Sequence, residues 1–180
     1  MKNIVVLTVA TVLIGFSGAA QATGTSSPLT EKQVMELKTA WGQGIVKIGK
    51  AHKKGGDYKA AAREHIKRFY AYGQKTVLFK PTLASKDQFR GTFDEALSYF
   101  VGGKLAEDKG FAIAPYTAVR WEPEGTTIDG STALAMGNYY FKKTDGSEVK
   151  VEYTFGITKM DNGELKIVLH HSSLPFVPST

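Results

Sequence analysis

The spacing of the apolar residues changes once along this chain of 180 residues, near Tyr116. Before Tyr116 the apolar residues recur every three or four positions, as on a helix that packs one side against a core. After Tyr116 they alternate with polar residues, as in a strand with one buried face. Because the helices all precede the strands, the pattern predicts an α+β fold in which N-terminal helices pack on one face of a curved antiparallel sheet.

Polar residues that can accept a hydrogen bond from a backbone amide precede each helical pattern. They are Thr30 with Gln33, which fit a capping box, then Asp57, then Thr92 with Glu95, which fit a second capping box. Glycines follow the three patterns, at Gly55-Gly56, Gly73 and Gly102-Gly103. The sequence therefore predicts three helices between residues 30 and 103.

The period-two segments are residues 116–122, 132–143, 149–157 and 164–174. A shorter β-like run at 76–80 lies between the second and third predicted helices. The Asn162-Gly163 turn predicts a hairpin between the last two strands. We expect the sheet to wrap around a helix and to leave a pocket at its wide end, which is the cone of the nuclear-transport-factor-two-like fold.

The first 22 residues have the pattern of a secretory signal peptide. Met1-Lys2 is a short positive segment, residues 4–16 are apolar, and Ala20-Gln21-Ala22 is a small-residue cleavage site. The apolar run is shorter than the roughly 20 residues that span a bilayer, and no later segment is long enough, so we expect no membrane association after cleavage. The pattern predicts cleavage after Ala22 and a periplasmic or secreted protein.

One domain is expected in the mature chain, from residue 30 to residue 176. A flexible leader rich in Ser, Thr and Gly precedes it at 23–29, and a short tail follows it at 177–180. No internal repeat or linker divides this region, and its length is adequate for a hydrophobic core of its own.

Several kinds of site are excluded or disfavoured by composition. The chain has no cysteine, which excludes disulfides, thiolate zinc sites and cysteine nucleophiles. Its four histidines show neither H-E-x-x-H nor H-x-H spacing, and there is no G-x-S-x-G motif of a serine hydrolase. The formal net charge is +6, but the cations are scattered among acidic residues, which disfavours nucleic acid as a partner and suits a small anion better.

The most unusual segment is His170-His171-Ser172-Ser173, in which four polar residues end an apolar strand. Successive side chains of a strand point to opposite faces, and the apolar residues just before this segment occupy odd positions. This parity places His171 and Ser173 in the pocket. Val168 does not fit the pattern, and a bulge at the preceding turn would reverse it. The alternative is a strand end whose polar groups meet water.

Two further stretches carry polar candidates. An apolar run that includes Phe79 leads into Thr82, whose hydroxyl follows Pro81. Arg90 is a candidate anion contact, and Tyr99 lies at the end of a mainly apolar helix, from which its hydroxyl can point into a pocket. Each also has an ordinary structural role, as a turn hydroxyl, a charge beside a helix or a core tyrosine.

Four segments, in this order, resemble the iota class of carbonic anhydrases. They are VLFKPT at 77–82, FRGTFDEALSYFVGG at 89–103, EDKGFAI at 107–113 and HHSSLP at 170–175. The resemblance runs from about residue 30 to residue 176. The HHSS ending is also similar to the association domain of calcium/calmodulin-dependent kinase II and its bacterial relatives, which share the fold.

In that class a threonine, a tyrosine and a serine hold bicarbonate beside apolar residues. The resemblance implies these roles for Thr82, Tyr99 and Ser173, with Ser172 as the competing serine. It also implies a homodimer. Members have been described with and without a metal, so no cofactor is predicted, and zinc or manganese stays open.

The activity implied is the reversible hydration of carbon dioxide to bicarbonate and a proton. We expect the hydroxyls of Thr82, Tyr99 and Ser173 to orient water against carbon dioxide in an apolar pocket. We expect His171 to accept or relay the proton, since a free imidazole titrates near neutral pH. The remaining members of the predicted substrate-binding set are Phe79, Arg90, His170 and Ser172.

Two other functions stay open on the same fold. One is an isomerase, cyclase or dehydratase for a larger organic substrate, which needs a larger pocket and an inward-facing base such as an Asp–His pair. The other is a non-catalytic ligand-binding or oligomerisation module, because a fold does not determine a function.

Overall fold

The computed structural model describes residues 28–179 of the chain. The predicted signal peptide at 1–22, its cleavage site after Ala22 and most of the predicted leader at 23–29 lie outside the described residues, as does Thr180. No described helix has both the length and the apolar character needed to cross a bilayer.

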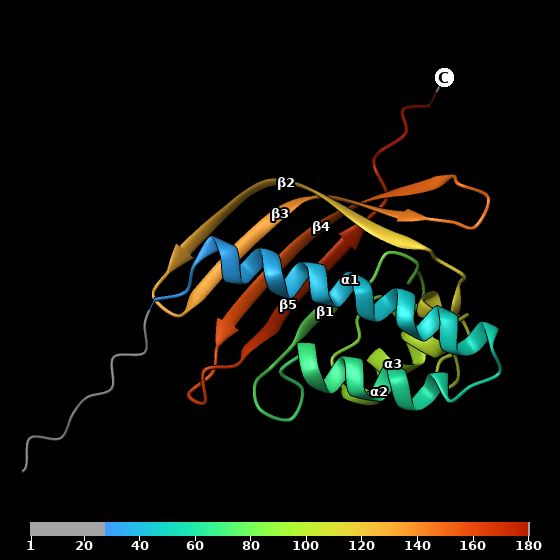
Figure 1. Cartoon of the computed structure of the whole chain (residues 1–180), viewed down its shortest axis with the longest axis horizontal. Coiled ribbons are helices and arrows are strands. Elements are labelled where there is room, and N and C mark those ends of the chain that lie inside the picture. Colours follow the sequence, from blue (N-terminus) through green and yellow to red (C-terminus); the bar gives the residue numbers. More distant parts are fainter. Residues whose placement is uncertain (1–27, 180) are drawn as a thin grey trace, which may run out of the picture.

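Helices precede the long strands, as the apolar spacing predicts (Figure 1). The helices are α1 (Glu31–Lys53), α2 (Tyr58–Phe69), α3 (Phe93–Val101) and a single 3-10 turn, η1 (Phe111–Ile113). The strands are β1 (Leu78–Lys80), β2 (Ala118–Asp129), β3 (Thr132–Lys142), β4 (Glu148–Lys159) and β5 (Leu165–Ser173). The predicted α+β class is confirmed.

Each helix begins at the capping residue expected from the sequence. The Thr30 hydroxyl accepts a hydrogen bond from the Gln33 amide at 3.3 Å, and the Gln33 side chain accepts one from the Thr30 amide at 3.0 Å. Thr92 and Glu95 form the same reciprocal pair at α3. The Asp57 carboxylate caps α2 by accepting from an amide of its first turn. The caps satisfy amides that have no partner inside the helix.

The sheet has the strand order β1-β5-β4-β3-β2 and is not wholly antiparallel. Strands β2 to β5 form the predicted antiparallel meander. Strand β1 instead runs parallel to β5, with Phe79 opposite His170 and Lys80 opposite His171. The sequence did not predict the parallel partner of β1, because a three-residue strand carries no local signal of its distant partner or direction.

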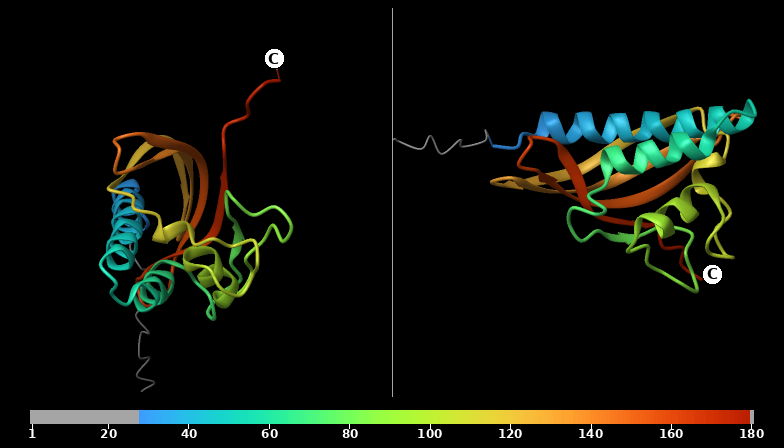
Figure 2. Two further views of the ribbon diagram at one scale, coloured as in Figure 1. Left: turned by 90° about the vertical axis from the view of Figure 1, so that its right-hand side faces the viewer. Right: turned by 90° about the horizontal axis from the view of Figure 1, so that it is seen from below.

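The helices all lie against one face of the sheet. The curved sheet wraps partly around α1, and α2 lies beside α1 (Figure 2). Trp41 is buried at the centre of this layer, where its indole contacts rings from α2 and from the sheet, among them Tyr139 and Phe155. None of the helices in residues 28–179 lies on the other face of the sheet (Figure 1).

A backbone feature in β3 marks where the sheet bends over α1. Gly137 has a φ of +154°, and a Cβ atom at this position would lie 2.4 Å from the Glu122 carbonyl oxygen. On the facing strand the register shifts between Pro123 and Gly125. Such a bulge increases the local bend and twist of paired strands, and only glycine fits the position opposite it.

Candidate active site

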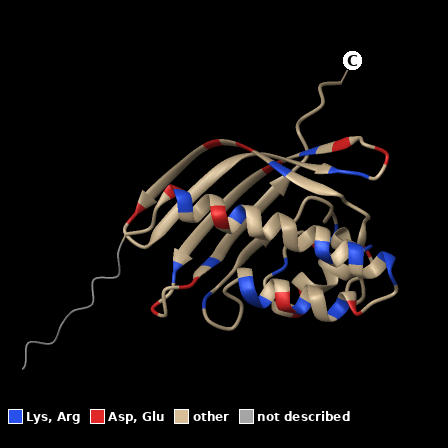
Figure 3. Ribbon diagram, in the orientation of Figure 1, with Lys and Arg blue, Asp and Glu red and all other residues tan. Residues whose placement is uncertain are grey.

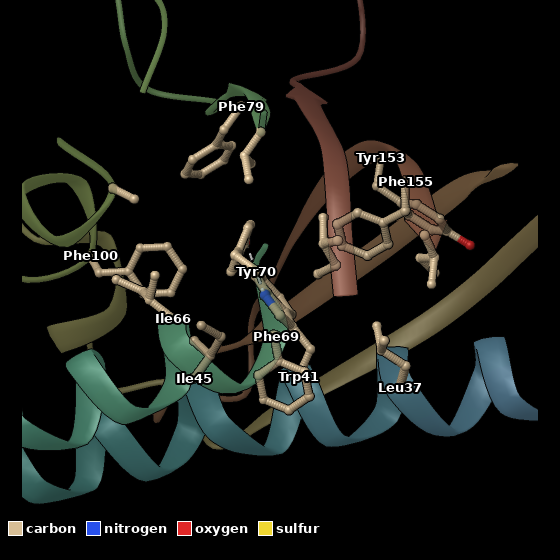
Figure 4. Close-up of a cluster of buried hydrophobic side chains, with 14 of the residues drawn as sticks. Leu37, Trp41, Ile45, Ile66, Phe69, Tyr70, Phe79, Phe100, Tyr153 and Phe155 are labelled. Atoms are coloured by element: carbon tan, nitrogen blue, oxygen red, sulfur yellow. Dashed lines mark hydrogen bonds between the residues drawn. The ribbon is translucent and has the colours of Figure 1, made fainter. Parts of the chain in front are cut away.

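A narrow cavity lies where β1 and β5 end side by side, between α1, α3 and the inner face of the sheet. Its lining residues are Trp41, Phe79, Pro81, Thr82, Tyr99, Phe100, Phe111, Tyr139, His170 and Ser172. The aromatic walls include Trp41, Phe79 and Phe100, which approach one another from α1, β1 and α3 (Figure 4). The space has room for about one water-sized molecule, so it suits only very small ligands.

The cavity brings together residues that are far apart in the chain. The predicted site residues that line it are Phe79, Thr82, Tyr99, His170 and Ser172. His171, Ser173 and Arg90 are not among the described residues that line it. The sequence thus identified five of the ten lining residues, but the predicted face of the last strand and the predicted anion contact need correction.

The inward face of β5 is reversed by a bulge. Gly156 of β4 pairs with Leu169, but the next residue, Ile157, pairs with Ile167, so Val168 is an extra residue on β5. One extra residue shifts the alternation, and every later side chain of the strand changes face. The expectation that His171 and Ser173 point inward is therefore wrong.

Burial follows the reversed alternation. His170 and Ser172 are 3% and 2% exposed, whereas His171 is exposed on the outer face. Ser173 also lies on the outer face, where its hydroxyl donates to the Glu152 carboxylate at 2.9 Å. The histidine and serine at the cavity are thus His170 and Ser172.

Arg90 is buried outside the cavity and holds loops in place. Its guanidinium donates to the Asp108 carboxylate at 2.7 Å and lies 3.6 Å from a Glu107 oxygen. It also donates to the backbone carbonyls of Asp87 and Phe89. A guanidinium committed to these partners is not free to contact an anion in the cavity. The structure therefore does not support the predicted anion contact.

Aromatic rings hold the His170 imidazole on three sides. Phe79 stacks on it with ring centres 4.9 Å apart and an interplanar angle of 14°. Phe155 meets it edge-on at 4.3 Å, and Trp41 does so at 5.5 Å. Offset stacking and edge contacts of this kind are favourable and restrict the orientation of the ring.

Hydroxyl groups meet at the polar side of the cavity. Ser172 Oγ lies 2.5 Å from the Tyr139 phenol oxygen and 2.9 Å from His170 Nε2. The Thr82 hydroxyl interacts with the phenols of both Tyr99 and Tyr139. The Tyr99 oxygen also accepts a long hydrogen bond, 3.4 Å, from the Leu83 amide. Four hydroxyls from four separate segments therefore face one small space.

Tyr139 is the hydroxyl-bearing residue of the cavity that sequence reasoning missed. It lies on β3 and shares the buried face with Ala133, Ala135 and Phe141. A phenol on this otherwise apolar face was the available signal, because a buried tyrosine hydroxyl requires a hydrogen-bond partner. The partner, Ser172, is on β5, so the pairing is not readable from β3 alone.

The groups in the cavity are electrically neutral at neutral pH. Burial raises the pKa of the Tyr99 and Tyr139 phenols above the ordinary value, so they stay protonated. Burial also lowers the pKa of the His170 imidazole well below its ordinary value, and His171 and His65 add to this effect. The site therefore presents uncharged hydrogen-bond groups inside aromatic walls.

Comparison with known proteins agrees with this geometry. The family model described as metal-independent carbonic anhydrase matches residues 32–174. The chain belongs to this family. A metal-independent carbonic anhydrase from Nostoc sp. (strain PCC 7120 / SAG 25.82 / UTEX 2576) is 40% identical over 153 residues, which cover 82% of this chain and 75% of the relative.

Three solved structures place this carbonic anhydrase among known folds. The iota-carbonic anhydrase from a cyanobacterium, solved in complex with bicarbonate, matches with a TM-score of 0.81 and 38% identity, covering 84% of this chain and 95% of that one. A calcium/calmodulin-dependent protein kinase II association domain from Xanthomonas campestris matches with a TM-score of 0.54 and 17% identity, covering 84% and 96%. The second match concerns the fold alone. A nuclear-transport-factor-two-like protein from Pseudomonas putida matches with a TM-score of 0.51 and 15% identity, covering 82% of this chain and 87% of that one, and it confirms the expected fold.

The side chains of this carbonic anhydrase agree with the metal independence that its family is named for. Among residues 28–179, no three His, Cys, Asp or Glu side chains are grouped as a metal site requires. Hydroxyls and a single imidazole line the cavity, and no cysteine or carboxylate is among the described lining residues. One imidazole alone does not supply the three or four sulfur, nitrogen and carboxylate ligands that bind zinc in proteins.

Glu107 fixes the loop that carries Thr82 toward α3. Its carboxylate accepts hydrogen bonds from the amides of Ser85, Lys86 and Asp87 at 2.8–3.0 Å, and from the Ser85 hydroxyl at 3.0 Å. These bonds lower the pKa of Glu107 from 4.5 to about 2. A carboxylate with a depressed pKa stabilises the folded state when ionised.

We expect Glu107→Gln to lower the unfolding temperature at neutral pH. Because the folded-state pKa is depressed, the stabilisation is present above the ordinary value of 4.5 and is lost as the pH falls toward about 2. The difference in unfolding temperature between wild type and Glu107→Gln, measured by circular dichroism, should therefore become smaller as the pH falls through this range. Glu64→Gln, at an exposed glutamate on α2, is the control and should stay close to wild type. A difference that is unchanged at low pH would contradict the assignment.

Proposed function

We propose that this carbonic anhydrase hydrates carbon dioxide in the cavity between α1, α3 and β5, with the hydroxyls of Thr82, Tyr99, Tyr139 and Ser172 as the bicarbonate-binding groups. The observation that carries the proposal is the convergence of these hydroxyls in one aromatic-walled space of very small volume. The cyanobacterial relative that was solved with bicarbonate supports it.

The two sides of the cavity suit the two reactants. Carbon dioxide is an apolar molecule, and Trp41, Phe79, Phe100 and Phe111 provide apolar walls. Water needs hydrogen-bond partners, and the hydroxyls provide them on the opposite side. Holding both reactants in one orientation removes much of the entropic cost of bringing them together.

The hydroxyls also stabilise the charge that forms. As water attacks the carbon, it gives up one proton, which leaves to solvent water, and negative charge develops on an oxygen of carbon dioxide and persists in bicarbonate. Neutral hydrogen-bond donors that already point at this oxygen stabilise the transition state, and more strongly where bulk water is excluded. Bicarbonate is larger than the water-sized space, so the cavity must widen slightly to admit it.

The competing enzymatic function is not favoured by the cavity. An isomerase, cyclase or dehydratase for a larger substrate needs a roomy pocket with an inward base. The cavity has room for about one water molecule, and none of the described residues that line it is a carboxylate. The membership of the chain in the carbonic anhydrase family likewise argues against a purely structural module.

The serine assignment gives a matched pair of variants. Ser172→Ala removes a hydroxyl from the cavity, and we expect it to lower kcat/KM for carbon dioxide hydration by about 100-fold, the typical effect of losing one donor to a developing anion. Ser173→Ala removes an outer-face hydroxyl and should stay close to wild type. Stopped-flow hydration assays with a pH indicator measure the kcat/KM of both variants. The kcat/KM of Tyr139→Phe should be lowered as well, because this variant also removes a hydroxyl from the cavity.

The control is thermal unfolding of each variant, so that lost activity is not mistaken for lost folding. If Ser173→Ala loses the activity and Ser172→Ala keeps it, the inward assignment of Ser172 is overturned. If no variant at these hydroxyls changes the rate, the reaction does not take place in this cavity.

We propose that the protein is a homodimer and that the outer face of the sheet is its interface. Leu78, Leu169, Gly156 and Leu134 lie opposite one another on four neighbouring strands, and so form one apolar row across this face. The side chains at its two ends, Leu78 and Leu134, are 61% and 53% exposed. Charged residues are sparse on the central parts of β3, β4 and β5 (Figure 3). An exposed apolar row with few charges is typical of a surface that another subunit covers.

The interface is tested by Leu134→Glu, which places a carboxylate in the apolar row. We expect the wild-type protein to have the mass of a dimer in sedimentation velocity and Leu134→Glu to have that of a monomer. Met35→Glu, at an exposed apolar residue of α1, is the control and should stay dimeric. A monomeric wild-type protein, or a Leu134→Glu variant with unchanged mass, contradicts the proposed interface.

We propose further that the chain is exported to the periplasm or secreted, with residues 1–22 removed. The positive Met1-Lys2, the apolar residues 4–16 and the Ala20-Gln21-Ala22 site support this. When the full chain is expressed in a bacterium, N-terminal sequencing of the exported protein should begin at Thr23. Recovery only of cytoplasmic protein that still begins at Met1 would contradict the proposal. The control is Ala22→Asp, which disrupts the cleavage site and should prevent the appearance of protein that begins at Thr23.

A further inference from the structure

A chain of buried hydrogen bonds connects α1 to the back of the cavity. Trp41 Nε1 donates to the Tyr70 phenol oxygen at 3.1 Å, and this oxygen lies 2.8 Å from His170 Nδ1. Trp41, Tyr70 and His170 are all buried, and Tyr70 follows α2 directly. Figure 4 shows Tyr70 next to Trp41, in the layer between α1 and the strands.

The direction of this chain follows from the chemistry of its first member. An indole nitrogen only donates, so the Tyr70 oxygen accepts from Trp41. The hydrogen of the Tyr70 hydroxyl then needs an acceptor, and His170 Nδ1 is the polar atom that lies within reach. The opposite arrangement, with the hydrogen on Nδ1, would leave the Tyr70 hydroxyl hydrogen buried without a partner. Buried donors are rarely left unpaired, so Tyr70 donates and Nδ1 accepts.

The other side of the imidazole then has a defined role. A neutral imidazole carries one hydrogen, so if Nδ1 accepts, Nε2 carries it. His170 Nε2 lies 2.9 Å from Ser172 Oγ and 3.4 Å from the Tyr139 oxygen. The hydrogen on Nε2 is therefore donated to Ser172, and Ser172 keeps its own hydrogen to donate to Tyr139 or to a bound oxygen.

We infer that Trp41 and Tyr70 are positioning residues that hold His170 in the Nε2–H form, so that His170 acts as a hydrogen-bond donor toward Ser172 and not as the base that takes a proton from water. All the donors then point in one direction, from Trp41 through Tyr70 and His170 to Ser172. The hydrogen of Ser172 is left to face the oxygen on which charge develops. The catalytic consequence rests on the function proposed above, but the position of the hydrogen does not.

The surroundings of His170 support a fixed and neutral ring. The stacked Phe79 and the edge-on Phe155 oppose a ring flip that would exchange the two nitrogens. The titratable groups around it are the phenols of Tyr70, Tyr99 and Tyr139 and the imidazoles of His65 and His171. No carboxylate is among the described lining residues to stabilise an imidazolium.

Nitrogen NMR of the full chain labelled with ¹⁵N-histidine tests the assignment directly. Coupling patterns in long-range ¹H–¹⁵N spectra distinguish the two neutral forms of an imidazole from each other and from the imidazolium. We expect His170 to show the Nε2–H form alone across the pH range in which the enzyme is active. A His170 signal in the Nδ1–H form, or one that titrates together with the hydration rate, overturns the inference.

Tyr70→Phe removes the donor to Nδ1 and should bring in a second population, with the hydrogen on Nδ1. We expect kcat to fall by about 10-fold with little change in KM, the lower end of the loss seen when a metal-binding histidine loses the group that orients it. Tyr72→Phe is the matched control, because this nearby phenol donates to the Arg90 carbonyl, outside the cavity. It should leave the His170 spectrum and the rate unchanged.

The two readouts separate the possible failures. If the His170 spectrum of Tyr70→Phe equals that of wild type in a folded protein, Tyr70 does not hold the tautomer and the inference is wrong. If wild type shows the Nε2–H form but no hydration of carbon dioxide, the proposed function fails while the tautomer assignment stands.

Discussion

The parallel pairing of β1 with β5 is the contact on which the site depends. It spans only three residue pairs, yet it places Phe79 beside His170 and directs the chain after Lys80 across the end of β5. Thr82 and Ser172, which are far apart in the sequence, come to line one cavity in this way. A pairing this short is weak by itself, so it relies on neighbouring contacts. The amide of Arg90 bonds back to the Phe79 carbonyl, and the buried guanidinium holds the loop between them.

The polar groups that line the cavity are uncharged. Burying an ion among aromatic rings is costly unless a partner compensates it, whereas hydroxyls and a neutral imidazole can satisfy one another. The phenols stay protonated and His170 stays neutral because burial disfavours their charged forms. The result is a donor-rich space that suits an anion formed from uncharged reactants. The charged group that sequence reasoning placed near substrate, Arg90, instead pairs with Asp108 outside the lining.

Aromatic packing ties this polar site to the core. Trp41 contributes an apolar wall to the cavity and at the same time donates from its indole nitrogen to Tyr70. Phe79 and Phe155 hold the His170 ring between them. The same side chains thus stabilise the fold and orient the hydrogen-bond chain. The apolar spacing of α1 is enough to predict that Trp41 is buried, but it carries no sign of the hydrogen bond to Tyr70.

The sequence by itself determined the α+β order, the capped starts of the helices and the antiparallel meander. These features are local, since they follow from the period of apolar residues and from capping and turn residues. Only the tertiary structure decided the partner and direction of β1, the role of Tyr139 and the inward face of β5. The extra residue Val168 exists only relative to β4, because a bulge is a property of two paired strands. The alternation of a single strand contains no record of it, and this is why His170 and Ser172, rather than His171 and Ser173, face the cavity.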